Sequence, residues 1–370
     1  MKRAILSALV VAAVSTGTIN AQTAAFLPGR LAILRAGDGV MKLHLKQAPV
    51  FIDQFDPNIS NAAPSLTVQI PTNGAASFFF NGHAATEGLM TRSADHRMLV
   101  FAGYGGVGLL EEPGTPSLLD IQRGFCTVDA AGTVHTFLYY SRDLAGKMNP
   151  RCAATDGNSN FWNCGNPAGN LYYNPTDGPL VFQSVQDVKA VKIINHALYA
   201  LLNGPEGVAI GKSAGIYQFV GRAGAALLLP READATLDLV VPATAPYTKT
   251  AGFDLSPDGT IAYISDTKAG VQKYVKSGGA WKLAYNFAIP QNIPAGENHE
   301  TGCFGLAVDF SGPAPVIYAT TTEGYSGSVN SNRVVRIVDT NAAAVVTTVA
   351  QAGSANIAFR GIDFTPEAGR

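Results

Sequence analysis

The sequence predicts an all-β fold, a β-propeller with six blades, and two features of the 370-residue chain lead to that prediction. The first is a succession of short apolar runs rich in Val, Ile, Phe and Tyr and separated by Gly, Asp, Asn and Pro, the pattern of strands joined by tight turns. The second is a weak internal repeat of strand, polar turn and strand, with no convincing amphipathic helix after the N-terminal segment. The clearest strand-like runs are 31–34, 50–55, 66–70, 98–101 and 261–264.

Three copies of the repeat can be read along the chain, at residues 87–104, 252–263 and 303–318. Two further strand-like segments, 271–274 and 281–285, follow the second copy. Four successive antiparallel strands make one propeller blade, so the repeat favours a propeller. The structural alternative is a sandwich of two packed sheets.

The closing blade is expected to combine the two ends of the chain. Blade openings are expected near Glu87, Arg151, Val188, Gly252, Cys303 and Phe359. The last opening has no room for a blade behind it, whereas residues 30–71 offer only three good strands. We therefore expect residues 358–364 to supply the inner strand of that blade and to pair with 30–36, which hides two sheet edges. Seven blades result if residues 188–250 hold an additional partial blade.

The N-terminal segment has the features of a secretory signal peptide. Lys2 and Arg3 precede an apolar core at 4–14, and Ala21 is the small residue expected at a cleavage site. The apolar core is too short to span a bilayer. We expect residues 1–21 to be removed and residues 22–370 to form a single propeller domain outside the cytoplasm, either extracellular or periplasmic.

Charge is sparse and balanced, with 26 Lys and Arg, 27 Asp and Glu, and a formal net charge of -1. A dedicated nucleic-acid-binding protein needs a clustered basic surface, so the composition argues against that class. No later stretch has the length of a membrane-spanning helix. No P-loop, nucleophile elbow, zinc-protease or dinucleotide motif is present, and we expect neither a cofactor nor a metal.

The four cysteines fit an oxidising compartment. Cys152 and Cys164 flank a polar stretch rich in Asn, Asp and Gly that can bring both sulfurs within reach of a disulfide. Four cysteines allow three pairings, and we predict the Cys152–Cys164 bridge. Cys126 and Cys303 lie in apolar strand-like segments, which favours buried thiols.

Five segments of the mature chain, 27–30, 35–39, 49–53, 86–93 and 359–361, carry a resemblance to known proteins. The chain resembles a family of secreted bacterial propeller proteins that has no assigned activity. The resemblance covers nearly the whole mature chain and implies the propeller fold and export. It implies no catalytic residue.

Candidate site residues come from the inner-strand openings, because propeller ligands usually bind on loops at one end of the central channel. The candidates for proton transfer are His83, His299 and Tyr247. The candidates for ligand binding are Glu87, Arg92, Arg151, Lys189, Lys249, Glu300 and Arg360.

Each of these candidates has a structural alternative. Glu87, Arg92 and Arg360 can pair with one another or with the backbone and lock the blades together. The pair His299-Glu300 can belong to a solvated loop. Asp254 and Asp258 lie in a Ser-Pro-Asp-Gly turn and are interpreted as ordinary turn residues.

Two classes of function remain open at this point. The first is an extracellular binding or matrix protein whose channel face binds a glycan or another polar ligand. The alternative is a carbohydrate-active enzyme, a lyase or hydrolase acting on an acidic polysaccharide, because basic residues are expected near the channel.

Overall fold

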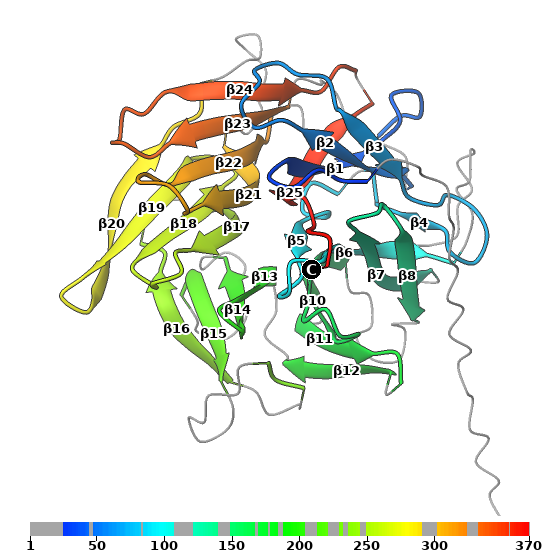
Figure 1. The fold of residues 1–370 in the computed structure, drawn as a ribbon. Helices are drawn as coiled ribbons and strands as arrows, with labels where there is room; N and C mark the ends of the chain where they lie inside the picture. The colour runs from blue at the N-terminus through cyan, green and yellow to red at the C-terminus, as the bar shows by residue number, and fades with distance from the viewer. Residues whose placement is uncertain are drawn as a thin grey trace, which may run out of the picture.

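The computed structural model shows a six-bladed β-propeller, which confirms the fold class (Figure 1). It describes residues 25–43, 47–82, 84–106, 121–139, 149–166, 169–176, 178–183, 188–203, 213–220, 229–231, 236–244, 249–290, 302–323, 332–354 and 356–369. The described residues contain strands and no helix. The signal-peptide prediction for residues 1–21 falls outside this part of the chain.

Each blade is an antiparallel sheet whose first-named strand lies nearest the centre of the ring. Blade 1 contains β25 (Ala358–Phe364), β1 (Leu31–Ala36), β2 (Val50–Phe55) and β3 (Leu66–Gln69). Blade 2 contains β5 (Met90–Arg92), β6 (Met98–Gly105), β7 (Gln122–Asp129) and β8 (Val134–Tyr139), and β4 (Phe78–Phe79) pairs with the end of β6, on the same edge as β5. Blade 3 contains β9 (Asn149–Thr155), β10 (Phe161–Asn166), β11 (Gly169–Asn174) and β12 (Gly178–Gln183).

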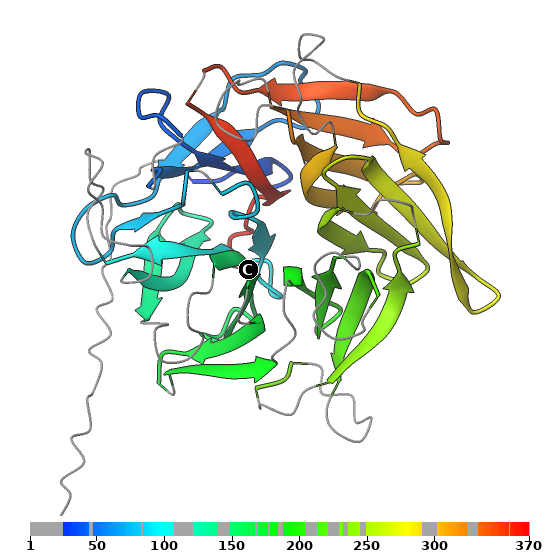
Figure 2. The same ribbon diagram turned by 180° about the vertical axis from the view of Figure 1, so that it is seen from behind.

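The other three blades follow in chain order and complete the ring, as the view from behind also shows (Figure 2). Blade 4 contains β13 (Val188–Ile194), β14 (Ala197–Leu202), β15 (Gly215–Val220) and β16 (Thr236–Pro242). Blade 5 contains β17 (Thr250–Leu255), β18 (Ile261–Asp266), β19 (Gly270–Ser277) and β20 (Ala280–Phe287). Blade 6 contains β21 (Cys303–Asp309), β22 (Val316–Thr321), β23 (Arg333–Val338) and β24 (Val346–Gln351). Residues 188–250 contribute blade 4 and the start of β17 rather than a seventh blade.

The two ends of the ring are joined as expected. β25 pairs antiparallel with β1, from Leu31 opposite Phe364 to Ala36 opposite Ala358. The joint is also packed, because Phe55 and Phe359 meet edge to face at 6.0 Å between ring centroids. Pairing the C-terminal strand with the N-terminal ones leaves neither of them as an open edge at the seam.

The inner strands are buried on both sides, because each faces the channel on one edge and neighbouring blades on its faces. All six residues of β17 are buried, and so are the first six of β25. Aromatic side chains fill the wedges between blades: Phe125 of blade 2 stacks on Phe161 of blade 3 at 5.0 Å. Trp162 is fully buried and donates its indole N–H to the Pro230 carbonyl at 2.7 Å.

Cys152 and Cys164 lie directly opposite each other on β9 and β10. The polar stretch between them forms a strand–turn–strand hairpin. All four cysteines are buried free thiols in the structure, and the Cys152 thiol donates to the Val191 carbonyl at 3.3 Å. The register thus places the two residues side by side, while their disulfide stays a prediction.

The inner strands define two faces of the ring, which we call the entry face, where these strands begin, and the exit face, where they end. Between the faces, the apolar side chains of Leu89, Met90, Phe253 and Leu306 leave a void of only about 20 Å³. A void of this size holds no ligand larger than one water molecule.

Candidate functional site

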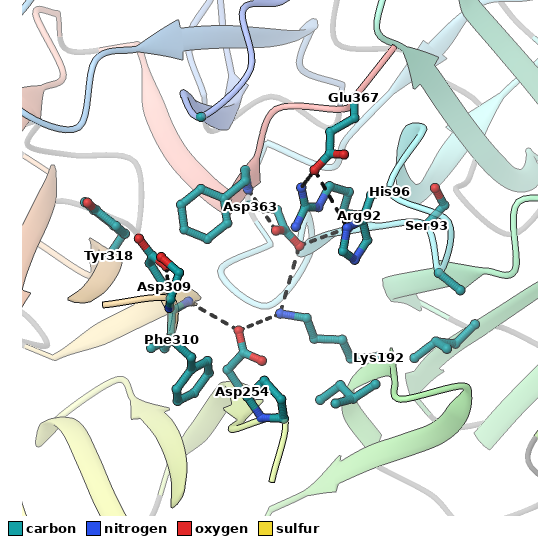
Figure 3. Close-up of a pocket in the computed structure, with 18 of the residues that line it drawn as sticks. Arg92, Ser93, His96, Lys192, Asp254, Asp309, Phe310, Tyr318, Asp363 and Glu367 are labelled. Atoms are coloured by element: carbon teal, nitrogen blue, oxygen red, sulfur yellow. Dashed lines mark hydrogen bonds and ion pairs between the residues drawn. The ribbon is translucent and has the colours of Figure 1, made fainter. Parts of the chain in front are cut away.

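The exit face holds an open cavity of about 870 Å³ over the centre of the ring (Figure 3). Its floor comes from the C-terminal ends of inner strands in five blades. The residues that contribute are Arg92 of β5, Lys192 of β13, Asp254 of β17, Val308 and Asp309 of β21, and Asp363 of β25. Because strands from different blades converge there, residues more than 270 positions apart in the sequence meet in one site.

Lys192 is the centre of the cavity's charged wall, which we define as Arg92, Lys192, Asp254, Asp363 and Glu367. The Lys192 ammonium donates to Asp254 Oδ2 at 2.8 Å and lies 4.0 Å from Asp363 Oδ2. Backbone N–H groups hold both carboxylates: Asp254 accepts from Val308 at 3.2 Å, and Asp363 accepts from Arg92 at 2.9 Å. The wall is thus preorganised by contacts between blades (Figure 3).

Burial and the neighbouring charges shift the pKa values of Lys192 and Asp254 in opposite directions. Burial by itself disfavours the charged ammonium of Lys192, but the two carboxylates outweigh it and raise the Lys192 pKa above its usual value. Burial also raises the pKa of the Asp254 carboxyl, and the neighbouring Lys192 only partly offsets that effect. Lys192 is therefore a cation at neutral pH and acts as a hydrogen-bond donor, not as a base.

Arg92 is held from the segment that follows β25. Its Nη1 lies 3.4 Å from Glu367 Oε1, and the Glu367 backbone N–H donates to the His96 carbonyl at 2.9 Å. The Arg92 Nε is buried without a hydrogen-bond partner. Burial and the positive charge of Arg92 lower the pKa of His96, so the imidazole at the rim is neutral at pH 7.

The opposite side of the cavity is lined by Asp309, Phe310 and Tyr318 (Figure 3), a set that we call the aromatic wall. Tyr318 and Phe364 pack edge to face at 5.9 Å. Asp309 Oδ1 accepts the Ser311 backbone N–H at 2.8 Å, and no described Lys, Arg or His forms an ion pair with this carboxylate. This wall presents the partly exposed Phe310 ring and one carboxylate without an ion-pair partner among the described residues.

His96 lies at a turn position that glycine occupies in the equivalent turn of blade 5. The turns at 93–98 and 256–261 share the same bonds: Ser93 and Ser256 each donate to the Asp two residues on, at 2.6 and 2.5 Å. The next residue has a φ of 62° at His96 and of 67° at Gly259. A left-handed backbone strains a residue with a side chain, so the imidazole is placed at the cavity rim at some cost in stability.

The sequence-predicted site residues divide between the two faces and a part of the chain that the structure does not describe. Glu87, Arg151, Lys189, Lys249 and Arg360 belong to the entry face, at or before the starts of inner strands. Arg92 is the last residue of β5 and lines the exit-face cavity. His83, Tyr247, His299 and Glu300 lie outside the described residues.

The predicted residues on the entry face form a packed polar network. Tyr104 donates to Glu87 Oε1 at 2.8 Å, and the Asn81 backbone N–H donates to Glu87 Oε2 at 3.1 Å. Arg360 donates to the backbone carbonyls of Glu87 and Asn81, both at 3.3 Å. Arg151 donates to the Val188 carbonyl at 3.3 Å. These contacts join blade 1 to blade 2 and blade 3 to blade 4, as the structural alternative supposed for Glu87 and Arg360.

Two further predicted residues are less enclosed. Lys249 is exposed, and its backbone N–H donates to Asp266 Oδ2 at 2.6 Å. Lys189 is half-buried near the start of β13.

Burial raises the pKa of Glu87 to about 7, even though Tyr104, Arg360 and Arg151 all act to lower it.

The sequence did contain a signal for the exit-face site. Residues 252–258 read GFDLSPD and residues 361–367 read GIDFTPE, two copies of one pattern. The shared Asp is Asp254 in one copy and Asp363 in the other, and both carboxylates face Lys192. Read singly, the first copy looks like turn chemistry, and only the repetition marks the Asp as a residue on the channel.

Within the described part of the chain, no group of three or more His, Cys, Asp or Glu residues could hold a metal ion. Nor do the residues described there include a helix long and apolar enough to cross a membrane.

Comparison with known proteins assigns no family to the chain. No family model matches the chain, and no curated protein matches its sequence. Two similar solved structures are described as putative 6-phosphogluconolactonases. The one from Bacteroides uniformis is 13% identical, with a TM-score of 0.44 over 87% of this chain and 82% of that chain. The one from Bacteroides fragilis is 12% identical, with a TM-score of 0.41 over 87% and 82%. The dihydro-heme d1 dehydrogenase NirN is 12% identical, with a TM-score of 0.37 over 88% and 54%. At such identities the likeness concerns the propeller fold alone.

Proposed function

We propose that this protein is an exported propeller that binds a glycan, or a similarly polar and hydroxyl-rich ligand, in the exit-face cavity. The observation that carries the proposal is the convergence of polar groups from five blades around an open volume of about 870 Å³. Ligand sites are concave and combine apolar walls with a few placed polar groups. Export rests on the composition of residues 1–21, with their basic start and short apolar core.

The cavity offers both kinds of contact that a sugar ring needs. The Lys192 ammonium has three N–H donors, and its single short contact is with Asp254, so it retains capacity for a ligand oxygen. Asp309 and the rim residues Asn195 and His196 present further polar groups to the cavity. Phe310, on the aromatic wall, supplies an apolar ring face for stacking.

Calorimetry on the best oligosaccharide from a glycan array tests this proposal. Phe310→Ala removes a stacking surface, and Lys192→Met removes the central donor. We expect either change to weaken binding by about tenfold or more. Lys282→Met is the matched control, because Lys282 is exposed on β20, and it should bind as the wild type does. A wild type that binds no glycan, or full binding by both cavity variants, would refute the proposal.

A second candidate is hydrolysis of the bound glycan, and one arrangement favours it. Asp254 and Asp363 both lie near Lys192, and burial raises the pKa of Asp254, as a general acid requires, so two carboxylates are present in one cavity. Release of reducing ends by the wild type but not by Asp254→Asn is the expected result. The cavity does not favour an acidic polysaccharide, because its lining contains four carboxylates against Arg92 and Lys192.

A further inference from the structure

The charges of the exit-face cavity do not balance. Its lining includes Asp254, Asp309, Asp363 and Glu367 but only two permanent cations, Arg92 and Lys192. On the charged wall the two cations are already occupied: Lys192 contacts Asp254 and Asp363, and Arg92 contacts Glu367. An incoming anion would thus meet cations that are shared with carboxylates.

The uncompensated charge has a definite place, at Asp309 on the aromatic wall. Its contact with the Ser311 N–H uses one carboxylate oxygen, and the remaining oxygen has no hydrogen-bond partner among the described residues. Phe310 follows Asp309 directly, and Tyr318 lines the same side of the cavity (Figure 3). A carboxylate beside the partly exposed ring of Phe310 is an environment that attracts an organic cation, by charge and by cation–π interaction.

We infer that the ligand of this cavity is an amine-bearing saccharide, with its ammonium against Asp309 and its hydroxyl groups toward Lys192. The inference rests on the proposed glycan-binding function and specifies the class of glycan. Under it, Glu367 has a second role as a specificity residue, because it neutralises Arg92 and so denies that guanidinium to sugar carboxylates.

Calorimetry at about pH 6 tests whether the cavity prefers an amine-bearing, a neutral or an anionic saccharide. The four ligands are glucosamine tetramer, N-acetylglucosamine tetramer, cellotetraose and a glucuronic acid tetramer. The first carries protonated amines, the next two are neutral, and the last is anionic. We expect the amine tetramer to bind at least about tenfold more tightly than cellotetraose, with the difference shrinking as salt is added. The acidic tetramer should bind most weakly.

Two variants test whether Asp309 causes the preference for the amine and whether Glu367 causes the weak binding of the acidic tetramer. Asp309→Asn should abolish the preference for the amine, so that the glucosamine tetramer binds no more tightly than cellotetraose. Glu367→Gln frees Arg92 and should improve binding of the acidic tetramer by several-fold. Glu367 is half-exposed, so neither its loss nor that of the partly exposed Asp309 should unfold the ring.

The outcomes also separate this inference from the proposed function. If neutral or acidic tetramers bind as well as the amine, or if Asp309→Asn keeps the amine preference, the inference is wrong while glycan binding stands. If none of the four saccharides binds and the glycan array is also empty, both are wrong.

Discussion

The two faces of the channel contain similar residue types in different circumstances. On the entry face, Glu87 and Arg360 are both about 1% exposed and make their contacts with neighbouring blades. On the exit face, Lys192 and Asp363 also pair across blades, but they border an open cavity of about 870 Å³. Charge near a propeller axis therefore does not itself indicate a ligand site. What differs among the described residues is that the exit-face charges border this cavity, whereas Glu87 and Arg360 are almost completely buried between blades.

The largest expected effect on the entry face is a dependence of stability on pH. A carboxyl whose pKa is raised to about 7 in the folded protein, from 4.5, holds its proton more tightly when folded. Stability contributed by Glu87 is then complete below about pH 4.5, falls as the pH rises, and is lost above about pH 7. The free energy of unfolding should decline by about 3 kcal/mol across that window.

Urea titrations of the wild type and of Glu87→Gln at a series of pH values measure this decline. The Gln variant resembles the protonated carboxyl and should lack this part of the slope. Equal slopes in the two proteins would show that Glu87 keeps an ordinary pKa and that the entry-face network is more solvated than its packing indicates.

Arg360→Met, on the entry face, should lower the stability of the fold without changing ligand binding at the exit face. The change keeps the apolar stem but removes the guanidinium that joins blade 1 to the Glu87 and Asn81 carbonyls of blade 2. We expect a loss of about 2 kcal/mol in unfolding free energy, with glycan affinity of the folded protein unchanged. A drop in affinity at temperatures where the variant is fully folded would move the ligand site toward the entry face.

His96→Gly, on the exit face, should weaken glycan binding without lowering the stability of the fold. Glycine relieves the left-handed strain that the equivalent turn avoids with Gly259, so stability should hold or rise by about 1 kcal/mol while glycan binding falls. Gly259→His is the reciprocal control: it should cost about 1 kcal/mol and leave binding intact. If His96→Gly kept full affinity, the imidazole would have no role in the site.

The fold was largely predictable from the sequence, because the strand pattern is a local property and closure follows from the incomplete blades at the two ends of the chain. The inner strands start within a few residues of the expected openings, and the end strand 358–364 matches β25. The site was harder to predict because it depends on which end of each inner strand stays open. Glu87 and Lys192 both lie near the channel, and only side-chain packing distinguishes them. The prediction concentrated on the strand starts and, of the charged wall, included only Arg92.

The central claim is that ligand binds at the exit face, and hydroxyl-radical footprinting with and without saturating oligosaccharide tests it most directly. The account predicts protection of residues 192–196, 309–311, 363, 364 and 367, which line the cavity, and unchanged reactivity around residues 81–88. Protection confined to residues 81–88 and the neighbouring entry-face segments, with 309–311 still reactive, would contradict it.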